Sequence, residues 1–382
     1  MKIGIATTWR EICGISTYNS YFTDSLRVIN PDIYILAEDR SAGGPDEDQK
    51  SDLPYTECWN RYHGYDDPAR PSFLSIVEKE KPDIIHWSHE FGLFCLTQKT
   101  ANEYLVLLEK INRLGIKQTI VYHSVPQIPN RFFTEYFNQS SPLLDKIVVH
   151  NNEQLLSLKN DYKVPQSKLI HINHGVKLCP LYEQAEARRK LGIPLDKKVI
   201  MSMGFFGGLK GVEELIDVHS DIIKTNPDVL FYFVGGLHYA TAAYGKQYMK
   251  ECFRKILGKQ LRNKFFITGF VPEETLPYYY AASNLAVLNY KPSGYLSPSG
   301  CSAKLTASKR LIITTDGTHR NDELENNKQC IKVPYNDMNK MRTEIINSLE
   351  EDNTPIIENA YKYALENQWA KISEEYINEV WK

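Results

Sequence analysis

A lone lysine behind a glycine-containing loop is the sharpest chemical signal in the chain. The segment Gly204-Phe205-Phe206-Gly207-Gly208 follows an apolar run, and Lys210 and Gly211 come soon after it. Glycines let backbone N–H groups approach a diphosphate closely. A cation where a helix begins is unfavourable unless an anion lies nearby. We therefore interpret Lys210 as a phosphate ligand, with a surface lysine after a flexible turn as the alternative.

A second candidate for anion binding is the segment Ser299-Gly300-Cys301-Ser302, which precedes residues that we expect to be helical through position 308. Small residues where a helix begins let successive N–H groups face an anion. Ser-Gly also forms ordinary helix caps and turns, so this segment is weak evidence by itself. Lys309 and Arg310 fall at the expected helix end, where the dipole favours cations without any ligand.

Histidines follow several apolar runs in the first half: His86, His89, His123 and His174, with Glu90 next to His89. A zinc site would need a third ligand from elsewhere, and the spacing does not match the helical HExxH motif. Hydrogen-bonding or acid–base groups that line a cleft fit the pattern better. A structural histidine with its hydrogen bonds satisfied is an equally good interpretation for any one of them.

Apolar runs in the second half predict the strands that carry the glycine loop. They are residues 199–204, 229–234, 265–268 and 285–288, and special loops follow them. Continuous apolar runs of this length are typical of parallel strands covered on both faces by helices. In open parallel sheets, ligands bind at the carboxyl ends of the strands. The loops after these strands are therefore expected to form one site.

The first half alternates strand and helix in the same way. Strands are predicted at residues 2–6, 32–36, 84–87, 118–123, 146–150 and 168–172, with a helix from Ser16 and a long loop over 37–71. Apolar residues at helical spacing predict a long amphipathic helix, or two joined helices, over 356–382. The repeating βα pattern predicts doubly wound α/β domains.

Bulk composition excludes several classes of protein. The chain has 382 residues, a formal charge of −2 and seven cysteines without a CxxC pair. The length suits two domains. The net charge gives no strong signal for nucleic-acid binding, and the cysteine pattern indicates reduced thiols. The N-terminus resembles a first strand rather than a signal peptide. We expect a cytoplasmic protein, with peripheral membrane contact left open. The sequence lacks a nucleophile elbow, a GxxxxGK[ST] loop and a GxGxxG motif after the first strand, which disfavours hydrolases, P-loop NTPases and NAD-dependent dehydrogenases.

The motifs in order resemble glycosyltransferase family 4, retaining nucleotide-sugar enzymes of the GT-B fold, and are closest to a bacterial mannosyltransferase-like branch. The resembling segments are Gly14-Ile15-Ser16-Thr17-Tyr18, His89-Glu90-Phe91-Gly92-Leu93-Phe94, Tyr122-His123-Ser124-Val125, His174-Gly175-Val176, Gly204 through Gly211, Gly269-Phe270-Val271, Ser299-Gly300 and the helix of Trp369. The resemblance runs over nearly the whole chain and implies two Rossmann-like doubly wound domains that face across a cleft. The implied divisions are 1–178 (acceptor domain), 179–360 (nucleotide-sugar domain) and a C-terminal helix, 361–382, that crosses back to the first domain.

The resemblance implies that a hexose moves from a GDP- or UDP-linked sugar to an acceptor hydroxyl with retention, in glycan or polysaccharide synthesis. Lys210 and His123 would be catalytic, while Arg10, His89 and Glu90 would bind the acceptor. No metal or other cofactor is expected. The implied donor-binding residues are Gly14, Gly207, Gly208, Lys210, Gly236, His238, Phe270, Val271, Ser299, Gly300, Cys301 and Lys304.

Two departures from the family pattern leave other functions open. The arginine of the GRxxxxKG motif is Phe205 here, which removes a forked diphosphate ligand. The glutamate that holds the ribose falls on Lys304, with Ser297 seven residues before it. A non-catalytic partner subunit or sugar-nucleotide sensor is therefore one alternative, and a nucleotide-sugar epimerase of the same fold is another. The acceptor, whether glycan, lipid-linked or a small molecule, cannot be identified from the sequence.

Overall fold

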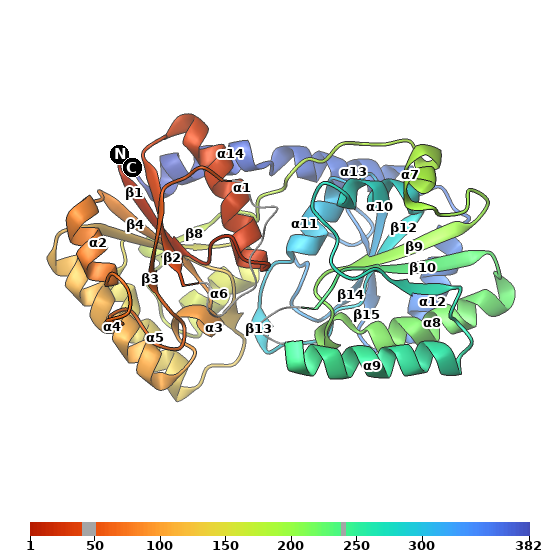
Figure 1. The fold of residues 1–382 in the computed structure, drawn as a ribbon, viewed down its shortest axis with the longest axis horizontal. Coiled ribbons are helices and arrows are strands. Elements are labelled where there is room, and N and C mark those ends of the chain that lie inside the picture. Colours follow the sequence, from red (N-terminus) through yellow and green to blue (C-terminus); the bar gives the residue numbers. More distant parts are fainter. Residues whose placement is uncertain (40–50, 238–241) are drawn as a thin grey trace. The chain divides into compact units, whose positions relative to one another are not determined.

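A computed structural model describes residues 1–39, 51–237 and 242–382 (Figure 1). The chain divides into two compact units. The first unit consists of Met1–Gly175, Gly294–Pro298 and Trp369–Lys382, and the second of Val176–Ser293 and Ser299–Gln368. Each is built on one parallel sheet. Within the described ranges, no helix has an apolar stretch long enough to cross a bilayer.

The described part of the first unit contains a seven-stranded parallel sheet of order β3-β2-β1-β4-β5-β7-β8. Its strands are β1 (Ile3–Thr7), β2 (Ile33–Glu38), β3 (Tyr55–Trp59), β4 (Ile84–His89), β5 (Lys117–Tyr122), β7 (Lys146–Val149) and β8 (Leu169–His171). Its helices are α1 (Gly14–Ile29), α2 (Phe73–Glu80), α3 (Phe91–Phe94), α4 (Gln98–Arg113), α5 (Arg131–Ser140), α6 (Asn152–Asn160) and α14 (Trp369–Glu375). A short strand β6 (Val125–Pro126) pairs antiparallel with β13 (Tyr295–Leu296).

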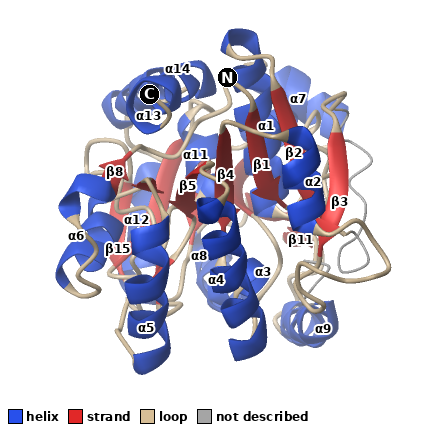
Figure 2. Ribbon diagram, turned by 90° about the vertical axis from the view of Figure 1, so that its left-hand side faces the viewer, coloured by secondary structure: helices blue, strands red, loops and turns tan. Residues whose placement is uncertain are grey.

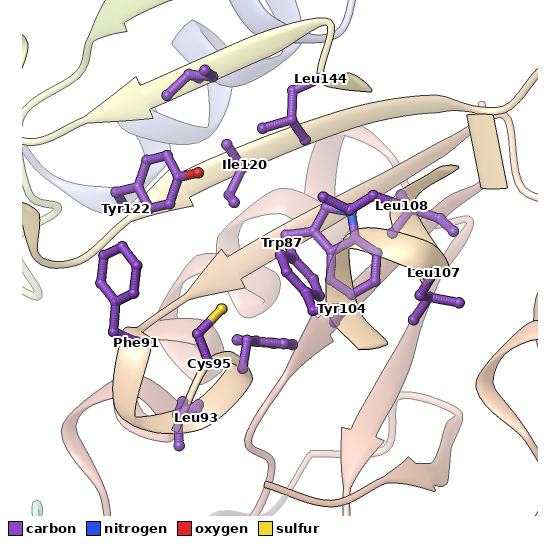
Figure 3. Packing of buried hydrophobic residues seen from close by; sticks show 14 of the residues in the cluster. Trp87, Phe91, Leu93, Cys95, Tyr104, Leu107, Leu108, Ile120, Tyr122 and Leu144 are labelled. Atoms are coloured by element: carbon purple, nitrogen blue, oxygen red, sulfur yellow. The ribbon is translucent and has the colours of Figure 1, made fainter. Parts of the chain in front are cut away.

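Successive residues of a strand point to opposite faces, so this sheet has two separate apolar cores. One core lies under α2, α4 and α5, as Figure 2 shows for α4 and α5. It is rich in aromatic rings, and Figure 3 shows Trp87 beside Tyr104, with ring centroids 5.0 Å apart. The other core holds Ile3 and Ile5 of β1 against residues of α1 and α14. The continuous apolar runs of the sequence follow from burial on both faces.

The second unit contains, among its described residues, a six-stranded parallel sheet of order β11-β10-β9-β12-β14-β15. Its strands are β9 (Lys198–Met203), β10 (Val229–Val234), β11 (Phe265–Ile267), β12 (Leu285–Leu288), β14 (Leu311–Asp316) and β15 (Ile331–Pro334). Its helices are α7 (Gln184–Leu191), α8 (Val212–Thr225), α9 (Ala242–Gly258), α10 (Leu276–Ala282), α11 (Gly300–Thr306), α12 (Met338–Ser348) and α13 (Thr354–Glu366). The predicted doubly wound α/β architecture is confirmed.

Three expectations from the sequence need correction. The region 37–71, predicted as a loop, contains the edge strand β3, in which Tyr55, Thr56 and Glu57 are half-buried and Cys58 and Trp59 are buried, so its sequence has neither a continuous apolar run nor a regular alternation. Residues 361–382 do not form one element of the first unit. The helix α13 ends at Glu366 in the second unit, and only Trp369–Lys382 belongs to the first. The segment Gly294–Pro298 belongs to the first unit, because β13 pairs with β6, rather than to the second.

Trp369 anchors the C-terminal segment within the first unit. Its indole is 5% exposed and lies edge-on to the ring of Tyr18, with centroids 4.8 Å apart. A Cβ added to Gly175 would lie 2.4 Å from the indole, so only glycine leaves room for this ring. After α14, a π-helical turn over Tyr376–Val380 completes the packing.

Candidate functional site

Glycines follow the carboxyl ends of three neighbouring strands in the second unit. Gly204 follows β9, Gly235 and Gly236 follow β10, and Gly269 follows β11. A Cβ on Gly235 would lie 1.9 Å from the carbonyl oxygen of Gly204, and one on Gly236 would lie 2.7 Å from the amide nitrogen of Phe270. These contacts are far below van der Waals distance, so the strand ends approach each other backbone to backbone. The edge predicted to bind a ligand is therefore a compact glycine-lined surface.

Lys210 lies over the end of β9. It ends a short 3₁₀ turn (Gly208–Lys210), and Gly211, with φ of 53°, precedes α8. A Cβ on Gly204 would lie 3.0 Å from Cε and 3.1 Å from Nζ of Lys210, and 3.1 Å from Sγ of Cys301. Nζ is 3.8 Å from that Sγ and 4.3 Å from the ring centroid of Tyr290. Gly204, Lys210 and Cys301, distant in the sequence, thus meet at one point.

The environment of Lys210 favours an anionic ligand. Burial is the main cause that lowers the pKa of its ammonium, and the charge of Arg320 adds to this effect. No ion pair involves Lys210 among residues 1–39, 51–237 and 242–382. A half-buried cation without a counter-charge is costly, and a phosphate would offset that cost.

The glycine loop itself offers backbone donors. Phe206 holds the loop in place: its N–H donates to the carbonyl of Gly236 at 2.7 Å, and its ring packs on Phe233 and Tyr248. The next two N–H groups, of Gly207 and Gly208, make no hydrogen bond to any of the described residues. Both N–H groups are therefore without an acceptor in the described ranges, and the phosphate role of Gly207 and Gly208 stays a prediction.

The Ser299–Cys301 segment begins α11, which has seven residues. Ser299 caps it by accepting from the N–H of Ser302 at 3.2 Å, and its Oγ also hydrogen-bonds to the hydroxyl of Tyr290. The ordinary-cap interpretation of Ser299 thus holds. Farther along α11, Lys304 forms an ion pair with Glu273, so its charge is engaged within the unit.

The segment after β11 carries an exposed aromatic ring. Phe270 is 49% exposed, directly after Gly269, while Val271 is half-buried against the neighbouring apolar cluster. An exposed aromatic face at a ligand-binding edge suits stacking with a nucleobase. His238, predicted from the sequence as a donor ligand, lies outside the described residues.

In the first unit, His123 belongs to a polar network at the carboxyl edge of the sheet. Its Nε2 lies 2.7 Å from Oγ of Ser88, which accepts from Nδ2 of Asn19 at 2.8 Å. Nδ2 of Asn19 also lies 2.7 Å from Oγ1 of Thr7. Burial lowers the pKa of His123 to about 3. The imidazole is therefore neutral at pH 7 and suits hydrogen bonding rather than general acid catalysis.

The prediction that His89 contacts an acceptor is wrong in this structure. Its ring is fully buried, stacks on Phe94 and lies 3.0 Å through Nε2 from the hydroxyl of Tyr136. Burial lowers its pKa to about 3. His86, three residues earlier in the same strand, points to the opposite face and contacts Trp381. The strand period of two therefore separates the two histidines that a zinc site would have needed together.

The other predicted first-unit residues are held by different neighbours. Glu90 caps α3 through the N–H of Phe91 at 3.0 Å and accepts from the hydroxyl of Ser124 at 2.6 Å. Arg10 donates to the carbonyl of Ser51 at 2.8 Å and lies over the ring of Tyr55. Gly14 is exposed where α1 begins, with open space around it.

Two residues of the second-unit site escaped prediction. Tyr290 is 1% exposed and places its ring under the ammonium of Lys210, while Arg320 lies over the same ring, with Cζ 5.6 Å from the centroid. Tyr290 follows β12 and could have been found from its place at a strand end. No spacing in the sequence links Arg320 to Lys210.

Comparison with known proteins identifies the unit that carries this site. Residues 183–364 match the family model described as glycosyl transferases group 1. This match covers slightly less than half of the chain. The matched segment contains Gly204, Lys210, Tyr290, Cys301 and Arg320, so the cation and glycine cluster lies within it.

Individual relatives agree with this assignment. D-inositol 3-phosphate glycosyltransferase of Corynebacterium efficiens is 26% identical over 155 residues, which cover 39% of this chain and 36% of that protein. The match therefore spans little more than a third of the curated relative. The chain is similar throughout to a glycosyltransferase from Rickettsia africae ESF-5 (18% identity, TM-score 0.74, 100% of this chain and 98% of that chain). It is likewise similar to Anabaena Alr3699/HepE in complex with UDP (15% identity, TM-score 0.75, 99% of each chain). These likenesses show that the chain has the GT-B fold. They do not single out the mannosyltransferase-like branch.

Proposed function

We propose that the protein is a glycosyltransferase that moves a hexose from a nucleotide diphosphate sugar to an acceptor hydroxyl, with retention at the anomeric carbon. The observation that carries the proposal is the convergence of Gly204, Lys210 and Cys301 at the carboxyl edge of the second sheet. At this edge, Lys210 has no counter-charge among the described residues. The backbone N–H groups of Gly207 and Gly208 have no hydrogen-bond acceptor among those residues either. Both features are what a leaving diphosphate requires.

The chemistry follows from charge. The bond between the anomeric carbon and the phosphate oxygen breaks, and negative charge develops on the diphosphate. Lys210 and the N–H groups of Gly207 and Gly208 stabilise that charge. The acceptor oxygen bonds to the anomeric carbon on the same face, and its proton passes to the departing phosphate. Because cationic side chains provide the neutralisation, we expect transfer to persist in the presence of a chelator.

The two units take separate roles in this proposal. The second unit binds the donor, with Phe270 available to stack on the base and the family match as support. HepE, of similar fold, was crystallised with UDP and with UDP-glucose, which makes UDP-linked sugars the first donors to test, followed by GDP-linked ones. The first unit binds the acceptor, with Glu90 and Arg10 as ligands. His123, neutral at pH 7, contacts the sugar through a hydrogen bond.

The test compares Lys210→Ala with a matched lysine variant. Thermal shift with UDP, GDP and their hexose conjugates identifies the donor, and release of nucleotide with and without candidate acceptors measures turnover. Lys210→Ala is expected to lower kcat/KM by orders of magnitude with little change in Tm. Lys224→Ala, which removes an exposed lysine that pairs with Asp221 in α8, is expected to behave as wild type. Near-normal turnover of Lys210→Ala would refute the diphosphate role.

The same experiment separates the alternatives. Tight binding of a nucleotide sugar without turnover would favour a sensor or partner subunit, the function suggested by Phe205 and Lys304. Interconversion of the free nucleotide sugar without an acceptor would favour an epimerase.

A further inference from the structure

A second cation lies beside Lys210, on a loop that carries no recognisable motif. Arg320 follows β14, which is next to β12 in the sheet. Its guanidinium carbon is 5.6 Å from the ring centroid of Tyr290, and Nζ of Lys210 is 4.3 Å from the same centroid. Two positive side chains from different loops therefore share one aromatic ring, which attracts both.

No acidic group of the described ranges neutralises this pair. Neither Lys210 nor Arg320 forms an ion pair within residues 1–39, 51–237 and 242–382, and Nε of Arg320 is buried without a hydrogen-bond partner there. The acids that follow Arg320 are engaged elsewhere: Asp322 lies 3.8 Å from Nζ of Lys332, and Glu323 accepts from the hydroxyl of Ser302 at 3.4 Å. The charge of Arg320 disfavours the charged form of Lys210, and like charges this close are unfavourable unless an anion joins them.

The loop holds Arg320 in a defined place. His319 and Asn321, on either side of it, have φ of 54° and 62°, a left-handed conformation that non-glycine residues rarely adopt. Asn321 is fully buried and donates from Nδ2 to Oγ1 of Thr314 at 2.7 Å. Strained backbone that is fixed by buried contacts is found where a side chain must be aimed.

We propose that Arg320 supplies the diphosphate-binding guanidinium that the glycine loop has lost at Phe205, so that Arg320 and Lys210 together bind the diphosphate of a nucleoside diphosphate. The inference rests on the proposed function, because it assigns a further ligand to the same donor site. A guanidinium forms two parallel hydrogen bonds to phosphate oxygens, which an ammonium cannot do. Its origin in the β14 loop rather than the β9 loop explains how the site keeps two cations without the motif arginine.

Two cations at one site also predict selectivity for the diphosphate over the monophosphate. A diphosphate offers oxygens to both Lys210 and Arg320, whereas a monophosphate can satisfy only part of the pair. Loss of Arg320 is therefore expected to weaken binding of UDP or GDP more than binding of UMP or GMP.

The test measures affinities of the full-length protein for these four nucleotides by calorimetry. Arg320→Gln is expected to weaken diphosphate binding roughly 10- to 100-fold, the loss typical for hydrogen bonds to a charged group. The ratio of the affinity for the diphosphate to the affinity for the monophosphate is expected to fall. Arg320→Lys keeps the charge but loses the fork, and is expected to fall between wild type and Arg320→Gln. Arg262→Gln is the control, because Arg262 is an exposed arginine of the same unit.

A rescue variant distinguishes a ligand from a structural residue. Phe205→Arg restores the motif arginine, so the double variant Phe205→Arg/Arg320→Gln is expected to recover diphosphate affinity if Arg320 acts as a ligand. If Arg320 only holds its loop in shape, Phe205→Arg is expected to change the diphosphate affinity by the same factor with and without Arg320→Gln.

The outcomes separate this inference from the proposed function. If Lys210→Ala weakens diphosphate binding and Arg320→Gln does not, the role of Arg320 is refuted and the donor site stands. If neither substitution changes the affinity, or the wild type binds no nucleotide, both proposals fail. If Arg320→Gln weakens diphosphate binding and Phe205→Arg does not restore it, the proposal that Arg320 takes the place of the motif arginine is also refuted.

Discussion

The substitution Gly204→Ala tests the geometry of the donor site without removing any charged group. Gly204 has φ of 127°, which an L-residue rarely adopts. Its added Cβ would lie 3.0 to 3.1 Å from Cε and Nζ of Lys210 and from Sγ of Cys301. These distances are shorter than ordinary contacts, so the flexible lysine must move away from the end of β9. Two separable effects are expected, one on stability and one on binding.

The effect on stability comes from the backbone and has a matched control. A non-glycine residue in such a conformation costs on the order of 1–3 kcal/mol. Gly192, after α7 in the same unit, has φ of 67° with nothing within 4 Å of an added Cβ. Gly192→Ala therefore introduces backbone strain alone, at about 1–2 kcal/mol. Urea denaturation of both variants measures this part of the effect.

The effect on binding belongs to Gly204→Ala alone. If displacement removes the hydrogen bond from Lys210 to a phosphate, the affinity for UDP or GDP falls by about 1.5–3 kcal/mol, which is roughly 10- to 150-fold. Calorimetry at a temperature where both variants are folded gives the affinity. In the double variant Gly204→Ala/Lys210→Ala, the losses should not add, because both changes remove one interaction. Wild-type affinity in folded Gly204→Ala would refute the placement of the lysine.

Two further predictions concern the first unit. Trp369→Ala should lower the free energy of unfolding by about 3–5 kcal/mol, because a buried ring is lost from the C-terminal anchor; a change below 1 kcal/mol in chemical denaturation would contradict this packing. His86 and His89 have pKa values lowered to about 3 by burial. The unfolded chain binds protons at these sites below about pH 6.5 and the folded chain does not, so stability falls as pH falls from about 6.5 toward 3, by roughly 2 kcal/mol per histidine at pH 5. His89→Gln removes one titrating group and should make the dependence of unfolding free energy on pH between 7 and 5 shallower; an unchanged slope would show that His89 is not buried in its neutral form.

Much of the fold could be predicted from the order of apolar runs. Each strand expected in the first half appears within two residues of its predicted bounds, as with β1 and β4. A parallel strand buried on both faces must be apolar throughout, so its signal is local. The edge strand β3 was missed because its first three residues, Tyr55–Glu57, are only half-buried and include polar side chains, so no continuous apolar run marks it. The packing of Trp369 in the first unit depends on its close contact with Gly175, and no local pattern in the sequence reveals that contact.

For the site, the glycines and the lysine after β9 could be found from the sequence, because glycine requirements and helix starts are set by neighbouring residues. The position of His89 in the core could not, since a polar side chain at a strand end can point into either layer. The position of Arg320 over Tyr290, near Lys210, likewise follows from the folded chain alone. The sheet order brings the loops after β9, β12 and β14 together, and strand order is fixed by long-range packing that the spacing of residues along the chain does not encode.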